Sequence, residues 1–317
     1  MTNLLGSNNG VTPTWAKSGK CIGLIKVSHG DTGDHERSPS CELDDGNIIP
    51  IKGRGAAFWE QKMESGEFKS GETEVSGCDF VRSSQGGDAE CFIPPGHTRF
   101  LSNVVNTDNQ EVHERRKLAI VGEKKILVVR VIAANGSTTS SEDALVGNVF
   151  TDSVNVATQY TACSNGQLNF QQTDDMTLTG TNDGDETGIT NGVTTVRVPM
   201  DAIKGGDQAM RGEIATALNQ NFGVTSPSQL ADYVMYCLPP GVMNGIAYAY
   251  INSWNSVYSD AWCNYVSAQM HEIGHNLGLA HSGEGGATYA DQSGMVSNGS
   301  ILTDSILSYK DLTHQCS

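Results

Sequence analysis

The chain has 317 residues, a formal net charge of −16, and 38% hydrophobic and 18% charged residues. This composition is typical of a soluble globular protein with one or two domains. The negative charge disfavours nucleic-acid phosphates and anionic lipids as partners. No window approaches the roughly 18 uninterrupted apolar residues of a membrane span, so we expect neither a nucleic-acid partner nor a membrane-inserted chain.

The cysteines are even in number and widely spaced. They are Cys21, Cys41, Cys78, Cys91, Cys163, Cys237, Cys263 and Cys316. No two have C-x-x-C spacing, which disfavours a zinc ribbon or a redox motif. The even count favours disulfides formed in an oxidising compartment over scattered buried thiols, although the pairing cannot be read from the sequence.

The N-terminal segment lacks the basic start and apolar run of a signal peptide. Either the protein is not secreted, or this sequence begins downstream of the start of the native precursor. Up to about residue 120, short segments such as "KCIGLIKVSHG" and "CELDDGNIIPIKG" predict strands joined by Gly, Ser and Asp turns. We therefore expect residues 1–120 to form a β-rich N-terminal region. The stretch "HERRKLAIVGEKK", residues 113–125, spans the division between the two parts and is either a processing region or a solvated linker.

The remaining residues, 121–317, begin with the clearest strand of the sequence. Residues 124–135 form a continuous β-branched run, which predicts a buried strand. Thr139 and Glu142 have the spacing of a capping box, which predicts the start of a helix that extends to Cys163. Strands are expected next at 167–172 and 193–200.

A second helix is predicted over 207–223, where apolar residues recur at helical spacing and Gly223 suits the C-terminal stop. Two further strands are expected at 231–237 and 245–254, and a third helix at 265–281. The order predicts an α/β or α+β domain with helices that back a twisted sheet, and we favour α+β with a mixed sheet.

The loop between the strands at 167–172 and 193–200 is acidic. Its carboxylates are Asp174, Asp175, Asp183, Asp185 and Glu186. They do not match the spacing of an EF-hand loop. A solvated loop is the simpler interpretation, with a calcium site as the alternative.

The last predicted helix carries the motif "HEIGHNLGLAH". His271 and His275 are four residues apart, so both imidazoles project from one helix face about one turn apart. On a straight helix His281 would lie ~9 Å further along the axis than His275. Gly278 can adopt a positive φ and turn the chain, which would return His281 as a third ligand.

Three neutral imidazoles and a water form the open site that is typical of catalytic zinc. Zinc lowers the pKa of its water, and Glu272 is placed to act as the general base. A solvated helix end and a zinc site without catalysis are the alternatives, and both explain the pattern less well. We predict His271, His275 and His281 as ligands of one Zn²⁺ ion and Glu272 as the catalytic residue.

The extended pattern H-E-x-x-H-x-x-G-x-x-H is the metzincin signature. Together with "ADYVMYCLPPG", "GIAYAYINSWNSVYSDAWC" and "YADQSGM", it resembles the gametolysin family of zinc metallopeptidases over roughly residues 124–296. The resemblance implies a metzincin-like domain with a zinc-binding active-site helix. It also implies a secreted, monomeric, calcium-tolerant endopeptidase that acts on proteins or glycoproteins of the extracellular matrix or cell wall. Ser282 after the third histidine is shared with matrixins, the nearest competing metzincin group.

The resemblance also implies three further features. Residues 1–120 would be a propeptide. Residues about 246–252 would form the edge strand that pairs with extended substrate. A prodomain cysteine (Cys21, Cys41, Cys78 or Cys91) could occupy the fourth zinc position, although no surrounding motif selects one.

The sequence departs from the family pattern after Met295, the candidate Met-turn residue beneath the metal. The expected Tyr and the C-terminal helix are missing, and Val296 is the alternative occupant of the position. We interpret the tail as a non-native end that truncates the domain. If the tail is native, the protein is expected to be a catalytically impaired zinc-binding relative that acts as a matrix-binding protein.

Five histidines have no partner at ligand spacing: His29, His35, His97, His113 and His314. We expect them to be solvated or hydrogen-bonded side chains.

Overall fold

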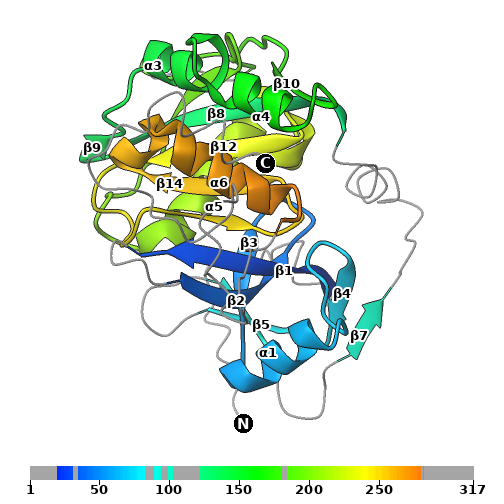
Figure 1. Ribbon diagram of the computed structural model, residues 1–317. Coiled ribbons are helices and arrows are strands. Elements are labelled where there is room, and N and C mark those ends of the chain that lie inside the picture. Colours follow the sequence, from blue (N-terminus) through cyan, green and yellow to red (C-terminus); the bar gives the residue numbers. More distant parts are fainter. Residues whose placement is uncertain are drawn as a thin grey trace.

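The computed structural model describes residues 20–30, 35–82, 89–93, 99–102, 121–179, 184–279 and 281. In these residues, strands from both ends of the chain form one 14-stranded sheet, with β10-β8-β12-β14-β13-β1-β2-β3-β6-β5 as its main path. The sheet therefore crosses the boundary expected near residue 120 (Figure 1).

The C-terminal part of the sheet is mixed, mainly parallel, and centred on β8. Its strands are β8 (Gly122–Ala133), β9 (Gly136–Ser137), β10 (Leu168–Gln172), β11 (Val193–Arg197), β12 (Tyr233–Leu238), β13 (Ala247–Tyr250) and β14 (Asn255–Ser259). Strands β10, β11 and β12 run parallel to β8, and β14 runs parallel to β12. Strand β13 is antiparallel to β14.

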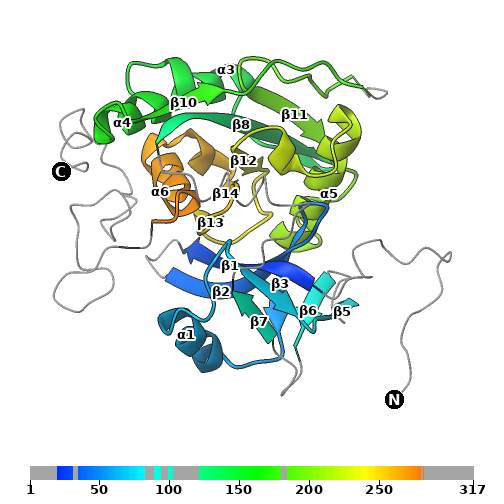
Figure 2. The same ribbon diagram turned by 90° about the vertical axis from the view of Figure 1, so that its right-hand side faces the viewer.

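Helices cover both faces of this part. They are α3 (Glu142–Val146), the π-helix η2 (Gly147–Thr151), α4 (Val156–Cys163), α5 (Gly206–Phe222), α6 (Val266–Asn276), and the 3-10 turns η3 (Pro227–Gln229) and η4 (Asp260–Asn264). Figure 2 shows α5 and α6 on opposite sides of the strands.

The side chains of β8 explain why its central residues, 126–129, are apolar on both faces. Leu127 and Val129 lie in a core with α5, whereas Ile126 and Val128 lie in a second core with α3, α4 and α6. Because successive side chains point to opposite faces, a strand covered by helices on both faces must be apolar throughout. The buried strand predicted at 124–135 is confirmed.

The helix expected from the start signal near Thr139 to Cys163 is divided in two. Ser141, not Thr139, caps α3, because its side chain accepts a hydrogen bond from the backbone N–H of Ala144. Asp152 then adopts an extended conformation, and Asn155 caps α4 by accepting from the N–H of Thr158. The prediction of one helix with a Thr139 capping box was wrong because Asn155 supplies a second cap.

The N-terminal part is β-rich, as expected. Its elements are β1 (Lys20–His29), β2 (His35–Glu42), β3 (Ile48–Lys52), α1 (Ala56–Glu64), β4 (Thr73–Ser76), β5 (Asp79–Arg82), β6 (Ala89–Phe92) and β7 (Arg99–Ser102). The helix α1 was not predicted, and no side chain caps its start to give a local signal.

Disulfides occur in both parts of the fold. Cys21–Cys41 joins β1 to β2, Cys78–Cys91 lies in the same N-terminal core, and Cys237–Cys263 joins β12 to η4. Cys163 is also disulfide-bonded. The disulfide interpretation of these cysteines is confirmed, and it fits an oxidising compartment.

Within the described residues, no helix combines the length and apolar character needed to cross a membrane.

The buried apolar face of α5 provides a test of the core packing. Ile214 is 0% exposed and packs between α5 and the sheet, whereas Ile203, just before this helix, is 75% exposed. Ile214→Ala is expected to lower the free energy of unfolding by about 2–5 kcal/mol, because it leaves a cavity in a closely packed core. Ile203→Ala, the matched control, should change it by less than about 0.5 kcal/mol. Equal losses for the two variants in denaturant titrations would contradict this packing.

Candidate metal site

Helix α6 carries two of the predicted residues on one face. His271 and His275 are 6% and 0% exposed and lie one turn apart. Neighbouring elements hold the helix in place, since the Tyr160 hydroxyl on α4 donates to the carbonyl of Met270 at 2.7 Å. The Asn276 side chain also donates to backbone carbonyls of the sheet, at 3.0 and 2.9 Å.

The helix ends at Asn276, earlier than the expected bound of 281, and the predicted turn at Gly278 follows it. Gly278 has a φ of +94°, and its N–H donates to the carbonyl of His275 at 2.9 Å. The N–H of Leu279 donates to the carbonyl of Gly274 at 3.0 Å. These bonds close the last turn, and the left-handed residue redirects the chain so that His281 returns toward the helix.

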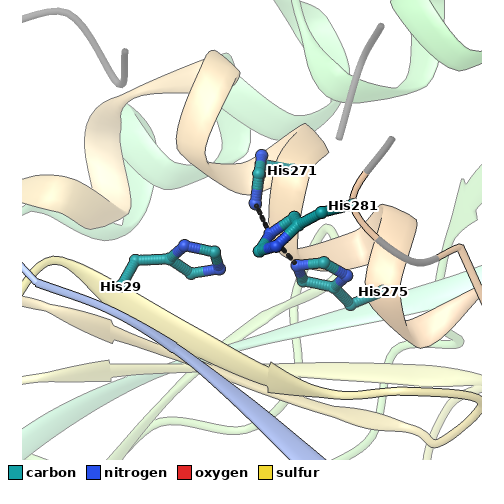
Figure 3. Close-up of side chains that lie close together, drawn as sticks. All are labelled: His29, His271, His275 and His281. Atoms are coloured by element: carbon teal, nitrogen blue, oxygen red, sulfur yellow. Dashed lines mark hydrogen bonds between the residues drawn. The ribbon is translucent and has the colours of Figure 1, made fainter. Parts of the chain in front are cut away.

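The three imidazoles meet at their Nε2 atoms (Figure 3). Nε2 of His281 lies 3.2 Å from Nε2 of His271 and 3.1 Å from Nε2 of His275. The other ring nitrogen of His275, Nδ1, lies 2.9 Å from the carbonyl of Leu279. A carbonyl at Nδ1 favours the tautomer with a proton there, which leaves Nε2 free to bind a metal.

Glu272 lies beside the imidazoles and is fully buried. Burial raises the pKa of its carboxyl group well above the usual range. Neither carboxylate oxygen accepts a hydrogen bond from the described residues, and Oε1 lies 3.4 Å from Nε2 of His29. A buried carboxylate that accepts no hydrogen bond needs a cation or a proton as its partner.

His29 completes the cluster from the other end of the chain. It ends β1, is 3% exposed, and its ring centroid lies 4.5 Å from that of His271 and 5.1 Å from that of His281. The expectation that His29 has no partner at ligand spacing was wrong, and its side chain is buried and not solvated. The β1–β13 pairing that brings it here has no local signal in the sequence. The side chain of His35 and the whole of His97, His113 and His314 lie outside the described part of the chain.

The donor set fits a zinc ion. The four histidines His29, His271, His275 and His281 each offer a ring nitrogen, all within 4.8 Å of one another. Two nitrogens bound to one tetrahedral zinc are about 3.3–3.4 Å apart, given bonds of about 2.0–2.1 Å. The observed spacings of 3.1 and 3.2 Å are close to this value.

The acidic loop does not form such a cluster among its described residues. Asp174 pairs with Lys125, and Asp185 pairs with Arg197. Asp175 accepts from the N–H of Asn191 at 2.9 Å. These carboxylates have separate protein partners, so calcium stays a prediction without structural support.

Two other expectations concern residues around the site. Cys21, Cys41, Cys78 and Cys91 are all disulfide-bonded, so none offers a thiolate to the metal and the proposed cysteine switch was wrong. Ser282, Met295, Val296 and the tail lie outside the described residues.

Comparison with known proteins gives one result. The model of a family described as gametolysin peptidase M11 matches residues 127–309. This range contains α6, Glu272 and the three histidines of the motif. No curated protein and no solved structure matches the chain.

The turn after α6 can be tested with a matched glycine. Gly278 and Gly122 have φ values of +94° and +90°, and a Cβ at either would meet no heavy atom closer than 3.9 Å. Gly278→Ala and Gly122→Ala should therefore each cost a similar ~1–2 kcal/mol of stability through backbone strain. Only Gly278→Ala should lower the zinc bound per chain, because only this turn positions His281. Equal zinc content in the two variants would contradict that role.

Proposed function

The chain belongs to the gametolysin family of peptidases, and from this premise we propose that it is a zinc-dependent endopeptidase. The proposed substrates are proteins or glycoproteins of the extracellular matrix or cell wall. One catalytic Zn²⁺ would be held by His271, His275 and His281. Membership of the family implies a metallopeptidase. The identity of the metal and the class of substrate are what we propose in addition.

The observation that carries the proposal is the meeting of the three Nε2 atoms beside a buried carboxylate. Without a cation, the two oxygens of the buried Glu272 carboxylate would stay without a hydrogen bond from the described residues, next to three Nε2 atoms at 3.1–3.2 Å. Neutral nitrogen ligands and an open position are typical of catalytic zinc. The structure thus supports a metal at the point where the imidazoles converge.

When bound, zinc supplies a Lewis acid that polarises the scissile carbonyl and lowers the pKa of an attacking water. The chain supplies the proton transfers. Glu272 takes the proton of the water as general base and then gives it to the leaving amine. Its carboxylate is therefore deprotonated again at the end of the reaction. A carboxyl whose pKa is raised by burial holds that proton more readily than an exposed one.

The organisation of the fold supports two further parts of the proposal. The sheet order β8-β12-β14-β13 leaves β13 as the antiparallel edge strand of the C-terminal part, next to α6. We assign this edge to extended substrate, as in a metzincin-like cleft. Residues 1–120 are assigned as a propeptide, and the disulfides support maturation in an oxidising, extracellular compartment.

The proposed base is tested by Glu272→Gln, which keeps the shape of the side chain but removes its basicity. We expect casein cleavage to fall by at least ~10²–10⁴-fold, because the water loses its proton acceptor. The zinc content should stay at one ion per chain. Cleavage is measured both on the intact chain and after limited trypsin treatment, with and without 1,10-phenanthroline.

The matched control is Glu186→Gln. Glu186 accepts hydrogen bonds from the N–H of Arg197 and the side chain of Asn221, away from the histidines. It should retain full activity. Cleavage that survives both Glu272→Gln and phenanthroline would contradict the proposed mechanism. Zinc binding without cleavage in the wild-type chain would indicate a non-catalytic relative.

A further inference from the structure

The edge of β13 is already occupied in this chain. Strand β1 pairs with it antiparallel, with Lys26 opposite Tyr250 and His29 opposite Ala247. The pairing continues past both ends of β13. The N–H of Ile251 donates to the carbonyl of Ile25 at 3.0 Å, and the N–H of Ile246 donates to the carbonyl of His29 at 2.9 Å. Strand β1 therefore uses the main-chain groups that an extended substrate would need.

Just before β13, the backbone of Gly245 lies very close to the backbone of His29. Gly245 has a φ of +90°, and a Cβ at this position would lie 2.5 Å from the carbonyl oxygen of His29. Only glycine allows this approach without moving the strand. The close fit fixes where β1 ends, and hence where the His29 side chain enters the cluster.

The side chain of His29 points into the space between the other imidazoles (Figure 3). Its ring stacks parallel to that of His275 with centroids 5.5 Å apart, and its Nε2 lies 3.4 Å from Oε1 of Glu272. It thus contacts both the three-histidine cluster and the proposed general base. An attacking water has to bind in this same position.

Further contacts hold β1 against the C-terminal part. Nζ of Lys26 lies 3.4 Å from Oδ2 of Asp207 on α5 and 3.7 Å from the ring centroid of Tyr248 on β13. Burial acts to raise the pKa of the Asp207 carboxyl, but the charges of Lys26 and Arg211 outweigh it and hold that pKa below its usual value. The carboxylate is therefore stabilised by the β1 lysine.

The strands beyond β1 are also attached. The indole N–H of Trp254 donates to Glu42 on β2 at 2.7 Å. The guanidinium of Arg211 donates to the carbonyl of Ile48 on β3 at 3.1 Å. These bonds are spread along the interface, so the N-terminal part is docked as a body and not by one strand alone.

We propose that His29 is the fourth metal ligand of the intact chain, and that β1 keeps the peptidase latent by occupying both the metal and the substrate edge. The inference rests on the proposed function, since it requires a metal at the three-histidine cluster. Four imidazoles complete a tetrahedral site and leave no position for water. Activation is then a ligand exchange, in which His29 leaves, water takes its place and Glu272 gains access to it.

Cobalt substitution tests the ligand directly. In the Co²⁺-loaded full-length chain, His29→Cys should produce a thiolate-to-cobalt charge-transfer band in the near ultraviolet. Ser28→Cys is the matched control. Ser28 is the adjacent residue on β1, and successive side chains of a strand point to opposite faces. It should give no such band. A band in both variants or in neither would overturn the proposal.

A second measurement does not depend on an added thiol. The wild-type Co²⁺ protein should show no spectral change with azide, because its coordination is complete. His29→Ala should bind azide and should lose cobalt to EDTA at least tenfold faster than wild type. Azide binding by the wild-type chain would overturn the proposal even if no variant folds. Failure of the wild-type chain to bind cobalt at all would instead contradict the proposed function.

The docking of β1 is tested by charge reversal on the strand itself. Lys26→Glu places a carboxylate against Asp207 and should raise the basal hydrolysis of a fluorogenic peptide by the full-length chain at least fivefold. Lys20→Glu is the matched control, because Lys20 pairs with Glu74 inside the N-terminal part, at 2.9 Å. Equal activities of the two variants would overturn the view that β1 blocks the site.

Discussion

The pairing of β1 with β13 is the interaction on which the arrangement of this chain depends. A strand at a sheet edge presents unpaired N–H and C=O groups, and these groups are satisfied either by another strand or by water. Here β1 satisfies those of β13 from Ile246 to Ile251. That pairing joins two β-rich parts into one sheet, in which Leu24 of β1 and Ile48 of β3 share a core with α5 and the C-terminal strands, and its register places His29 beside His271 and His275 of α6. Without the pairing, the histidines of α6 would face a free edge strand.

The helix supplies the second constraint, because its C-terminal turn determines where the third imidazole of the motif lies. His271 and His275 follow from helical geometry alone, whereas His281 depends on the positive φ of Gly278. The Glu272 carboxylate is fully buried beside this cluster, and burial explains its raised pKa. The end of α6 therefore brings together the metal ligands and the general base. A cation bound there affects the free energy of both.

The sequence predicted what is encoded locally. The motif of α6 lies within eleven residues, and the spacing of its histidines and glycine was sufficient to predict the convergence of three imidazoles. The apolar centre of β8, residues 126–129, and the stop of α5 at Gly223 follow equally local rules. The place of His29 could not be predicted, because strand pairing between distant segments depends on the whole sheet and has no short-range pattern. The break at Asn155 was missed for a different reason, since the start signal near Thr139 was taken to open one helix, although asparagine is favoured at an N-cap and disfavoured in a helix interior.

The attachment of β1 to the rest of the N-terminal part also determines how the proposed latency can end. Strand β1 is joined to β2 by the Cys21–Cys41 disulfide, and both strands belong to the core that contains Trp59 and Phe68. Strand β1 therefore cannot separate from β13 by itself, and the N-terminal part must leave as a unit. While the chain is intact, this part is held at a high effective concentration next to the site, so a substrate competes poorly for the edge. A cut between the two parts removes that advantage but leaves the strand pairing, the Lys26–Asp207 ion pair and the His29 position in place. Cleavage and dissociation are thus separate steps, and the second determines when the metal becomes accessible.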